Sequence, residues 1–584
     1  MKQYIESLLQ KSLTELQTKG ELPAIPAFIQ VEPTKDKQHG DFATNIALTL
    51  AKVAQKKPRQ IAELIIAALP ATSHIEKMEI AGPGFINFFL SKEALTGIVK
   101  RILQEKENFG RCKIGREKKV LVEFVSSNPT GPLHVGHGRH AAFGAVVANL
   151  LDAVGFKIHR EYYINDAGRQ MDILAVSVWL RYLALLGETI TFPANAYQGE
   201  YVVDIARDLQ AKEGPEYQVD AKKLFAGLPK DEPEGGDKEI YIDALIDRAK
   251  QLLGERYTTL YQQGLADILA DMREDLTQFG VDYDQWFSEL ELNEKGGVDH
   301  LIAKLKEAGH CYEREGALWF ASTSLGDEKD RVLVRSNGQR TYFANDVAYH
   351  CNKFERSFDI AIDILGSDHH GYIQRMKAAV QALGVNPERL IILLVQFVSL
   401  YRGGQPASMS TRGGNFVTLR ELREEVGNDA ARFFYVMRKN EQPMDFDLDL
   451  AKSQSNDNPV YYVQYAHARI CSVFKQLEDR RWKYDEANGL AHLDKLKEEQ
   501  ERQILNTLSR YPDMIISAAL EYEPHLMTHY LRDLAADFHA YYNSCQFLVE
   551  DAALRDARLA LISAVKQTLL NGFNLLGISA PESM

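Results

Sequence analysis

Residues 120–164 constrain the fold of this chain more than any other segment. VLVEFV (120–125) is an apolar run broken by one acid, which is typical of a buried parallel strand. The loop SSNPTGP follows, then a helical pattern that ends at Gly155, and then a second strand of about FKIHREYYI. Strand, helix and strand in this order form a βαβ unit, which predicts an α/β sheet.

Changes of pattern along the chain predict three domains. A chain of 584 residues is long enough for three or four. The first part mixes helical patterns with short strands and ends in a polar, basic stretch at 104–119, whereas apolar spacing is helical from about 450 onward. We therefore expect an α+β domain at 1–115, a Rossmann-like doubly wound α/β domain at 116–450 and an all-α domain at 451–584.

The middle domain is expected to carry insertions at about 165–300. Residues 195–240 are interpreted as a loop-rich acidic insertion, with helices resuming to about 290. The segments RVLVRSNGQRTYFANDVAYH (331–350) and FDIAIDILGSDHHGY (358–372) predict further strands joined by short turns.

Composition narrows the possible functions and sites. The formal net charge of −13 argues mildly against nucleic-acid binding, although a large enzyme needs positive potential only where it touches phosphate. The five cysteines are far apart, which predicts free thiols and no cysteine zinc site. We expect no membrane span, because no run of 18 apolar residues occurs, and a cytoplasmic protein, because the N-terminus resembles an amphipathic helix.

His134, Gly136 and His137 lie where the first strand has ended and a helix begins. Helix N-termini present unpaired N–H groups and partial positive charge, which suit phosphate. Imidazoles there can donate hydrogen bonds to a triphosphate, and the glycine lets a flat base approach the backbone. The alternative is a pair of histidines that cap an ordinary helix.

A second polar loop runs from Arg402-Gly403-Gly404 through Ser408 to Asn415, and it contains a glycine pair near each end. Between the two pairs it carries one side chain with a permanent positive charge, Arg412. Such a loop could close over phosphates and stabilise charge in a transition state. Taken alone, it would be interpreted as a surface loop without a role. The pairing with the histidine motif favours function.

The two motifs resemble the HIGH and KMSKS motifs of class I aminoacyl-tRNA synthetases. Longer segments resemble the arginyl-tRNA synthetases: FVSSNPTGPLHVGHGRHAAFG, TYFANDVAYH, ILGSDHHGY, NPVYYVQYAHARI and the run from ALRDARL to LLGISAPESM. Counting weaker similarities as well, family-like segments are spread from about residue 30 to the last residue. The resemblance implies a class I catalytic domain at 116–450, an N-terminal domain that contacts the tRNA elbow, and an anticodon-binding domain at the C-terminus.

The resemblance also implies the reaction. L-arginine would be activated by ATP to arginyl-adenylate and then transferred to the 3′ end of tRNA(Arg), with Mg²⁺ and without a protein nucleophile. The tRNA would have to bind before activation. A monomer that contacts neither DNA nor membrane is expected.

Four residues are expected to hold the substrate arginine. By resemblance these are Glu123 and Asn128, before the first motif, with Tyr342 and Asp346 in TYFANDVAYH. A carboxylate in a buried strand is costly unless it is paired, and a guanidinium is a natural partner. The alternatives are an ion pair between Glu123 and a protein Lys or Arg, and a helix-start Asp beside a core Tyr.

The ATP site is expected to contain His134, Gly136, His137, Gly366, Asp368, Met409 and Ser410. His134, His137 and Arg412 are the predicted transition-state residues. The second motif lacks both family lysines, and the upstream position where some arginine enzymes carry a lysine is Gly131 here. Arg412, together with Arg402 or Lys377, would then have to supply the cation, and Arg412 is expected to contribute most. No metal site formed by protein side chains is expected.

Contacts with tRNA are expected in the two outer domains. Phe85 and Asn87 would hold a splayed base, and Tyr461, Tyr465 and Arg469 would meet the anticodon loop. Core packing is the rival interpretation for these aromatic residues. Rival functions are a class I synthetase for another amino acid, a small nucleotidyltransferase, and a degraded paralogue that only binds RNA.

Overall fold

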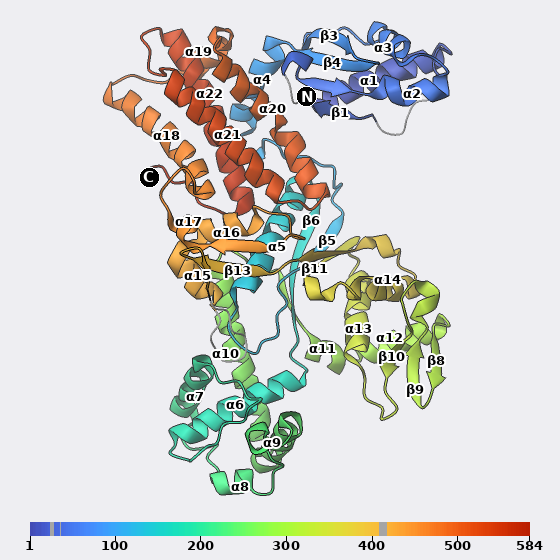
Figure 1. Cartoon of the computed structure of the whole chain (residues 1–584), viewed down its shortest axis with the longest axis vertical. Coiled ribbons are helices and arrows are strands. Elements are labelled where there is room, and N and C mark those ends of the chain that lie inside the picture. Colours follow the sequence, from blue (N-terminus) through green and yellow to red (C-terminus); the bar gives the residue numbers. More distant parts are fainter. Residues whose placement is uncertain (24–28, 35–36, 408–416) are drawn as a thin grey trace. The chain divides into compact units, whose positions relative to one another are not determined.

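The computed structural model describes residues 1–23, 29–34, 37–407 and 417–584 (Figure 1). The chain divides into two compact units. One comprises 1–112 with 455–522 and 526–584, and the other comprises 113–454 with 523–525.

The N-terminal part of the first unit is α+β. A four-stranded antiparallel sheet has the order β1 (Val31–Pro33), β2 (Phe42–Thr44), β4 (Phe85–Leu90), β3 (Ile75–Ala81), and its helices are α1 (Lys2–Thr18), α2 (Ile46–Ala54) and α3 (Pro58–Ala67). Ile86, Phe88 and Leu90 alternate along β4 and are buried, as expected for a strand with one face in a core.

The C-terminal part of the first unit is helical. Its helices are α18 (Pro459–Asp479), α19 (Glu486–Ala491), α20 (Glu499–Leu520), α21 (His525–Ser544) and α22 (Ala552–Leu576). Helix α4 (Lys92–Glu105) packs against α20 and α22, and the Phe109 ring stacks on Tyr511 with centroids 5.6 Å apart. The residues from about 91 to 112 therefore belong to the core of the C-terminal helices.

Among the described helices, only α22 is long and apolar enough to cross a membrane. Its most apolar window is 72 % buried inside the protein. This is the burial expected of a core helix.

A five-stranded parallel sheet forms the centre of the second unit. Its order is β12 (Leu390–Val395), β11 (Ile360–Gly366), β5 (Lys119–Glu123), β6 (Lys157–Ile164), β7 (Gln285–Ser288). From β5 the chain continues to β6 and β7 on one side, and it later adds β11 and β12 on the other. The strand order thus reverses between β5 and β11. In open α/β sheets, ligands bind at the carboxyl ends of the strands beside such a switch point.

Helix α5 (Val135–Ala153) connects β5 to β6 and packs closely on the sheet. A side chain at Gly144 would overlap the ring of Phe124, so glycine is required there. The expected βαβ unit and the doubly wound fold are confirmed.

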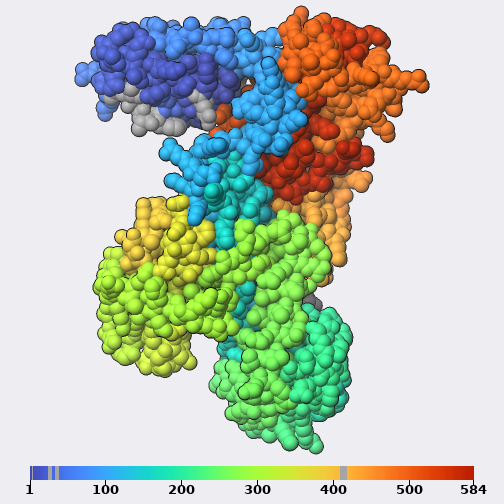
Figure 2. All heavy atoms as spheres, turned by 180° about the vertical axis from the view of Figure 1, so that it is seen from behind, coloured from blue at the N-terminus to red at the C-terminus, as the bar shows by residue number. Residues whose placement is uncertain are grey.

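A helical insertion separates β6 from β7 (Figure 1, Figure 2). It consists of α6 (Arg169–Leu185), α7 (Glu200–Glu213), α8 (Ala221–Phe225), α9 (Lys238–Leu253) and α10 (Arg256–Gln278). Residues 195–240 were expected to be loop-rich, yet α7 and α8 lie within them. Val202, Ile205, Ala206 and Leu209 bury one face of α7, so an amphipathic stripe persists in this acidic segment.

A mixed subdomain separates β7 from β11. It contains α11 (Glu289–Glu294), α12 (Gly297–Glu307), an antiparallel sheet of β8 (Cys311–Arg314), β9 (Ala317–Phe320) and β10 (Arg331–Val334), and α13 (Tyr342–Glu355). The expectation of strands in TYFANDVAYH is wrong, because this segment opens α13. Thr341 caps the helix, and Ala344, Val347, Ala348 and Cys351 recur at helical spacing and are buried.

The unit is completed by elements around the last strands. They are α14 (Tyr372–Ala382), β13 (Val398–Arg402), β14 (Gln405–Pro406), α15 (Leu419–Val426), α16 (Asn428–Val436), β15 (Met444–Asp447) and α17 (Leu448–Lys452).

Candidate active site at the carboxyl edge of the parallel sheet

His134 caps the N-terminus of α5. Its Nδ1 accepts hydrogen bonds from the backbone N–H groups of Gly136 and His137 at 3.0 and 3.4 Å, and its own N–H donates to Nδ1 of His137 at 3.3 Å. The two rings stack with centroids 3.6 Å apart. Burial lowers the pKa of both imidazoles, that of His137 the further. Neutral rings whose Nδ1 atoms accept must carry the proton on Nε2, so both can donate hydrogen bonds there.

The start of α5 is held against the residues that follow the second motif. His134 and Thr418 form an antiparallel bridge, the Val135 N–H donates to the Val417 carbonyl at 3.3 Å, and the Leu419 N–H donates to the Leu133 carbonyl at 2.8 Å. Thr418 also caps α15. Residues 417–419, which follow the second motif, therefore lie beside the histidine pair.

The residues of the second motif itself, Ser408 to Asn415 with the predicted site residues Met409, Ser410 and Arg412, lie outside the described residues. The alternative cations already have carboxylate partners. Arg402 donates to Glu425 at 2.7 Å, and Nζ of Lys377 lies 3.1 Å from Oε1 of Glu388.

Gly366 and Asp368 lie at the same edge of the sheet. Gly366 ends β11, and Asp368 is exposed in the turn that follows. A Cβ on Gly366 would lie 2.5 Å from Oδ1 of Asp368, so a side chain there would require the Asp368 carboxylate to move. Burial lowers the pKa of His140, on α5, to about 4, and the charge of Asp368 opposes this shift. The end of β11 and the first turns of α5 thus lie side by side.

A row of acidic residues crosses the sheet at the end of β5. Asp363 on β11 is in register with Glu123, and Glu123 is in register with Glu161 on β6. All three are buried. Sequence analysis identified only Glu123, because the register of distant strands is not visible in a single sequence.

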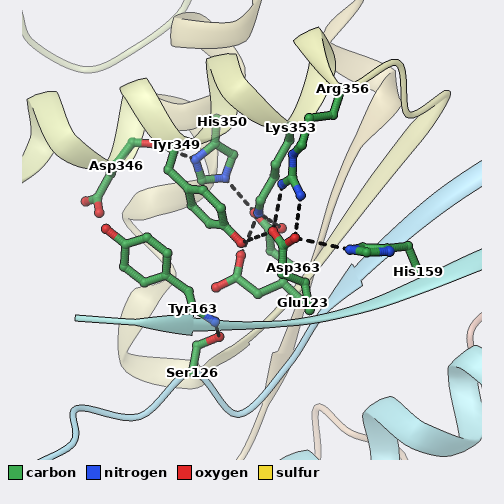
Figure 3. Close-up of polar contacts among 11 residues, drawn as sticks. Glu123, Ser126, His159, Tyr163, Asp346, Tyr349, His350, Lys353, Arg356 and Asp363 are labelled. Atoms are coloured by element: carbon green, nitrogen blue, oxygen red, sulfur yellow. Dashed lines mark hydrogen bonds and ion pairs between the residues drawn. The ribbon is translucent and has the colours of Figure 1, made fainter. Parts of the chain in front are cut away.

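Helix α13 neutralises this row (Figure 3). Nζ of Lys353, which is fully buried, lies 2.5 Å from Oε2 of Glu123 and 2.6 Å from Oδ1 of Asp363. Nε2 of His350 lies 2.7 Å from Oδ2 of Asp363. Despite burial, Lys353 has a raised pKa and Asp363 a lowered one, because each charge stabilises the other. The alternative interpretation of Glu123, an ion pair with a protein lysine, is therefore present in the structure.

Glu161 has its own partners. Arg356 donates to both carboxylate oxygens at 2.5 and 2.8 Å, and the Tyr349 hydroxyl donates to Oε1 at 2.6 Å. Burial alone would raise the pKa of Glu161, but hydrogen bonds from Arg356 and His159 lower it to about 2. These contacts hold the C-terminal end of α13 against β6.

A cluster of buried acidic side chains lies beside this network. Burial raises the pKa of Asp346 to about 7; Glu289 and Glu123 add to the rise, and His350 opposes it. Glu289, at the start of α11, is 4 % exposed and accepts a hydrogen bond from the Asn345 amide. Glu289 was missed by sequence analysis. The available signal was a glutamate directly after a strand, in WFSELEL, which reads equally well as a surface helix.

The other predicted arginine residues differ in exposure. Asn128 is exposed; its amide donates to Gln170 at 2.7 Å, and its oxygen accepts from Asn165 at 3.3 Å. Tyr342 is 64 % exposed, one helical turn before Asp346. The structure thus brings Glu123 and Asp346 together and leaves Tyr342 at the surface.

The loop that leads from β5 to His134 is strained and anchored. Val125 has φ 69°, which is unusual for a β-branched residue, and Ser126 has φ 41°. The Ser126 hydroxyl accepts from the Tyr163 N–H at 3.1 Å. Further along, Tyr201 of α7 donates to the Thr130 carbonyl at 2.7 Å and packs on Gly131, where a Cβ would lie 3.1 Å from its hydroxyl. Tyr201 therefore occupies the space beside the position where some relatives carry a lysine.

The predicted tRNA residues lie in the first unit. Phe85 is 41 % exposed on β4, whereas Asn87 is 4 % exposed, so of these two only Phe85 is accessible at the surface. On α18 the rings of Tyr461 and Tyr465 stack with centroids 5.7 Å apart. The Arg469 guanidinium lies 4.4 Å from the Tyr465 ring centroid and 4.7 Å from that of Tyr542. These side chains form a half-buried aromatic platform rather than a closed core.

Comparison with known families covers almost the whole chain. Residues 3–90 match the arginyl-tRNA synthetase N-terminal domain, 98–456 the class I (R) tRNA synthetase catalytic domain, and 463–584 the DALR anticodon binding domain. Curated relatives named arginine–tRNA ligase include those of Thioalkalivibrio sulfidiphilus, 59 % identical, and Legionella pneumophila strain Paris, 56 % identical, each covering 100 % of both chains.

Solved structures share the fold. The arginyl-tRNA synthetase of Thermus thermophilus has a TM-score of 0.76 at 24 % identity and covers 100 % of both chains. That of Plasmodium falciparum has a TM-score of 0.73 at 16 % identity and covers 100 % of this chain and 99 % of its own.

Proposed function

Since this chain belongs to the arginyl-tRNA synthetases, class I enzymes that join arginine to tRNA, we propose how its residues share that work. The reaction is the ATP-dependent activation of L-arginine to arginyl-adenylate and its transfer to tRNA(Arg). The observation that carries the assignment of the site is the convergence of three acids, Glu123, Glu289 and Asp346, at the end of β5, the strand that leads to the histidine-capped helix α5.

Arginine binds with its guanidinium among these acids. Lys353 holds Oε2 of Glu123, which leaves Oε1 to accept from the substrate. Asn128, on the loop after β5, binds the amino-acid end, and Tyr342 covers the pocket from the start of α13. A planar guanidinium can satisfy several carboxylate oxygens at once. A ligand with fewer N–H groups leaves buried acceptors unpaired, which makes its rejection strong.

ATP binds along the start of α5. The Nε2–H groups of His134 and His137 donate to phosphate oxygens, and the adenine ring lies over Gly136, where no side chain intervenes. Gly366 and Asp368 contact the ribose. Met409, Ser410 and Arg412 are proposed to close over the phosphates; the support is that Thr418, a few residues further along the chain, is bridged to His134. Arg412 supplies the cation that the two absent lysines supply in relatives.

Mg²⁺ arrives with ATP. The described residues contain no group of three or more His, Cys, Asp or Glu side chains that could hold a metal ion. Mg²⁺ commonly binds through one or two carboxylates together with substrate phosphates, and the exposed carboxylate of Asp368 fits that role. The bound ion would neutralise phosphate charge.

Catalysis needs positioning and charge stabilisation rather than a protein nucleophile. The arginine carboxylate attacks the α-phosphorus and pyrophosphate leaves, after which a ribose hydroxyl of the terminal adenosine attacks the adenylate carbonyl and AMP leaves. We expect tRNA to be bound before activation begins.

The tRNA contacts are assigned to the outer domains. Phe85 stacks on a base of the tRNA elbow with Asn87 beside it, and Tyr461, Tyr465 and Arg469 receive anticodon bases. The protein acts as a cytoplasmic monomer, without a DNA or membrane partner. The domains that perform these roles are 1–115, 116–450 and 451–584, although residues 91–112 pack with the last of them.

The first experiment is charging of total tRNA with each amino acid in turn, with ATP and Mg²⁺, beside the His137→Ala variant. Charging with arginine alone, abolished by the substitution, supports substrate and site together. Charging with another amino acid would contradict the assignment of the pocket, and full activity of His137→Ala would contradict the ATP site.

A further inference from the structure

Tyr163 projects from the carboxyl end of β6 toward the cluster of buried acidic side chains (Figure 3). Its ring packs against those of Tyr349 and Phe287, with centroids 4.4 and 6.2 Å away. Its backbone N–H is held by the Ser126 hydroxyl at 3.1 Å. The side chain is therefore fixed in place before any ligand binds.

The hydroxyl of Tyr163 is buried, and it interacts with the Glu289 carboxyl group without reaching ordinary hydrogen-bond geometry. The phenol oxygen accepts no hydrogen bond from any described residue. Replacing the tyrosine by phenylalanine would keep the ring packing and remove this polar group. A buried phenol oxygen that accepts from no donor of the protein can accept from a ligand.

Carboxylates surround this hydroxyl. Burial, followed by the charges of Glu289 and Asp346, raises the pKa of Tyr163 well above its ordinary value, so the hydroxyl keeps its proton. Figure 3 shows the hydroxyl and the Asp346 carboxylate turned toward each other. A phenol in this position can donate its proton to one carboxylate and still accept a hydrogen bond through its oxygen.

We propose that Tyr163 is a specificity-determining residue whose hydroxyl contacts the guanidinium of bound arginine. The phenol oxygen accepts one guanidinium N–H while its own hydrogen is donated to Glu289 or Asp346. This inference rests on the proposed arginine pocket and adds to it a neutral acceptor fixed by the fold.

This arrangement favours a ligand whose end group carries hydrogen-bond donors and no acceptor. Because the phenol hydrogen is used by a carboxylate, the oxygen can only accept. The guanidinium group offers N–H groups on every side, whereas the ureido group of citrulline carries an oxygen that would face acceptors. The lysine ammonium offers three N–H groups at one point and cannot bridge the same set.

The test is Tyr163→Phe in the full chain, with Tyr511→Phe as a matched control. The Tyr511 hydroxyl is also buried and accepts no hydrogen bond from any described residue, and it lies on α20 of the C-terminal helices. Arginine charging is measured against arginine concentration and ATP concentration, together with the thermal unfolding midpoint.

For Tyr163→Phe we expect the KM for arginine to rise about tenfold or more, because a hydrogen bond to a charged group is lost. The kcat and the KM for ATP should change by less than about twofold, and the unfolding midpoint should not fall. Citrulline should compete better with arginine than it does in the unsubstituted chain. Tyr511→Phe should leave all of these values unchanged.

An unchanged KM for arginine in Tyr163→Phe would overturn the inference. So would a lowered unfolding midpoint with parallel losses for arginine and ATP, because that is the signature of a structural role. If the unsubstituted chain charged tRNA with another amino acid, the proposed arginine pocket itself would be wrong. That outcome needs no variant, so it is distinguished from a failure of the Tyr163 inference alone.

Discussion

The ammonium nitrogen of Lys353 lies 2.5 Å from Oε2 of Glu123, and Lys353 is fully buried. The lysine therefore holds in one orientation a carboxylate that we propose binds arginine. The same nitrogen contacts Asp363, so one cation offsets two buried acids.

Lys353→Met should destabilise the catalytic unit by about 3–5 kcal/mol, because it leaves two buried carboxylates without their cation. Lys304→Met removes a cation from a surface pair with Glu355 and should cost about 1 kcal/mol or less. Thermal unfolding of both variants checks this. Equal shifts would show that the buried pair contributes no more than a surface one.

Arginine binding should weaken as the pH falls below about 7. The pKa of Asp346 is raised to about 7, so this carboxyl group is increasingly protonated below that pH. A guanidinium requires the ionised form, so affinity should fall by up to about tenfold per pH unit below 7 and level off above it. His134 and His137 have lowered pKa values and stay neutral from pH 7 upward.

The measurement is calorimetric titration of arginine between pH 5.5 and 8.5 with the unsubstituted chain and with Asp346→Asn. The variant should bind arginine more weakly and lack the step near pH 7. A step that persists in Asp346→Asn would assign the titration to another group.

His134 should have separable roles in stability and in activation. His134→Asn keeps an N-cap acceptor for α5, whereas His134→Ala loses it at a cost of about 1 kcal/mol. Both lose the Nε2 donor, so tRNA-dependent pyrophosphate exchange should fall by about 10²–10³-fold in both. A normal rate of pyrophosphate exchange by His134→Asn would show that His134 contributes only by capping α5.

Arg412→Ala should lower the rate of arginine activation by about 10²–10³-fold without changing arginine affinity. Arg402→Ala should change the rate much less, because Arg402 already pairs with Glu425. Single-turnover formation of arginyl-adenylate with tRNA bound distinguishes the two. A larger loss in Arg402→Ala would transfer the role of the cation to that residue.

Arg469→Ala should weaken tRNA(Arg) binding by about 10-fold or more, because it removes a cation from the aromatic platform that would receive a base. Arginine binding without tRNA should not change. Arg480→Ala, at the C-cap of the same helix and packed on Trp482, is the matched control. Equal weakening by both variants would indicate a general electrostatic effect.

The sequence by itself determined the βαβ unit, the position of His134 at a helix start and the separate helical C-terminus. These features depend on short-range periodicity and on turn residues, which one sequence displays directly. The motifs that resemble the family are also short segments, so they can be recognised without the fold. Sequence patterns therefore located Glu123, Asp346 and the histidine pair without knowledge of the fold.

Only the tertiary structure decided which groups meet. Lys353 and Glu123 are 230 positions apart, and they come together because β5 and β11 pair in register while α13 covers their row of acids. Strand register also revealed Asp363 and Glu161, and the packing around Asp346 revealed Glu289. TYFANDVAYH resembles a strand locally, but packing of one helical face against the core makes it α13. Strand register and long-range packing depend on the whole chain at once, so a local pattern cannot specify them.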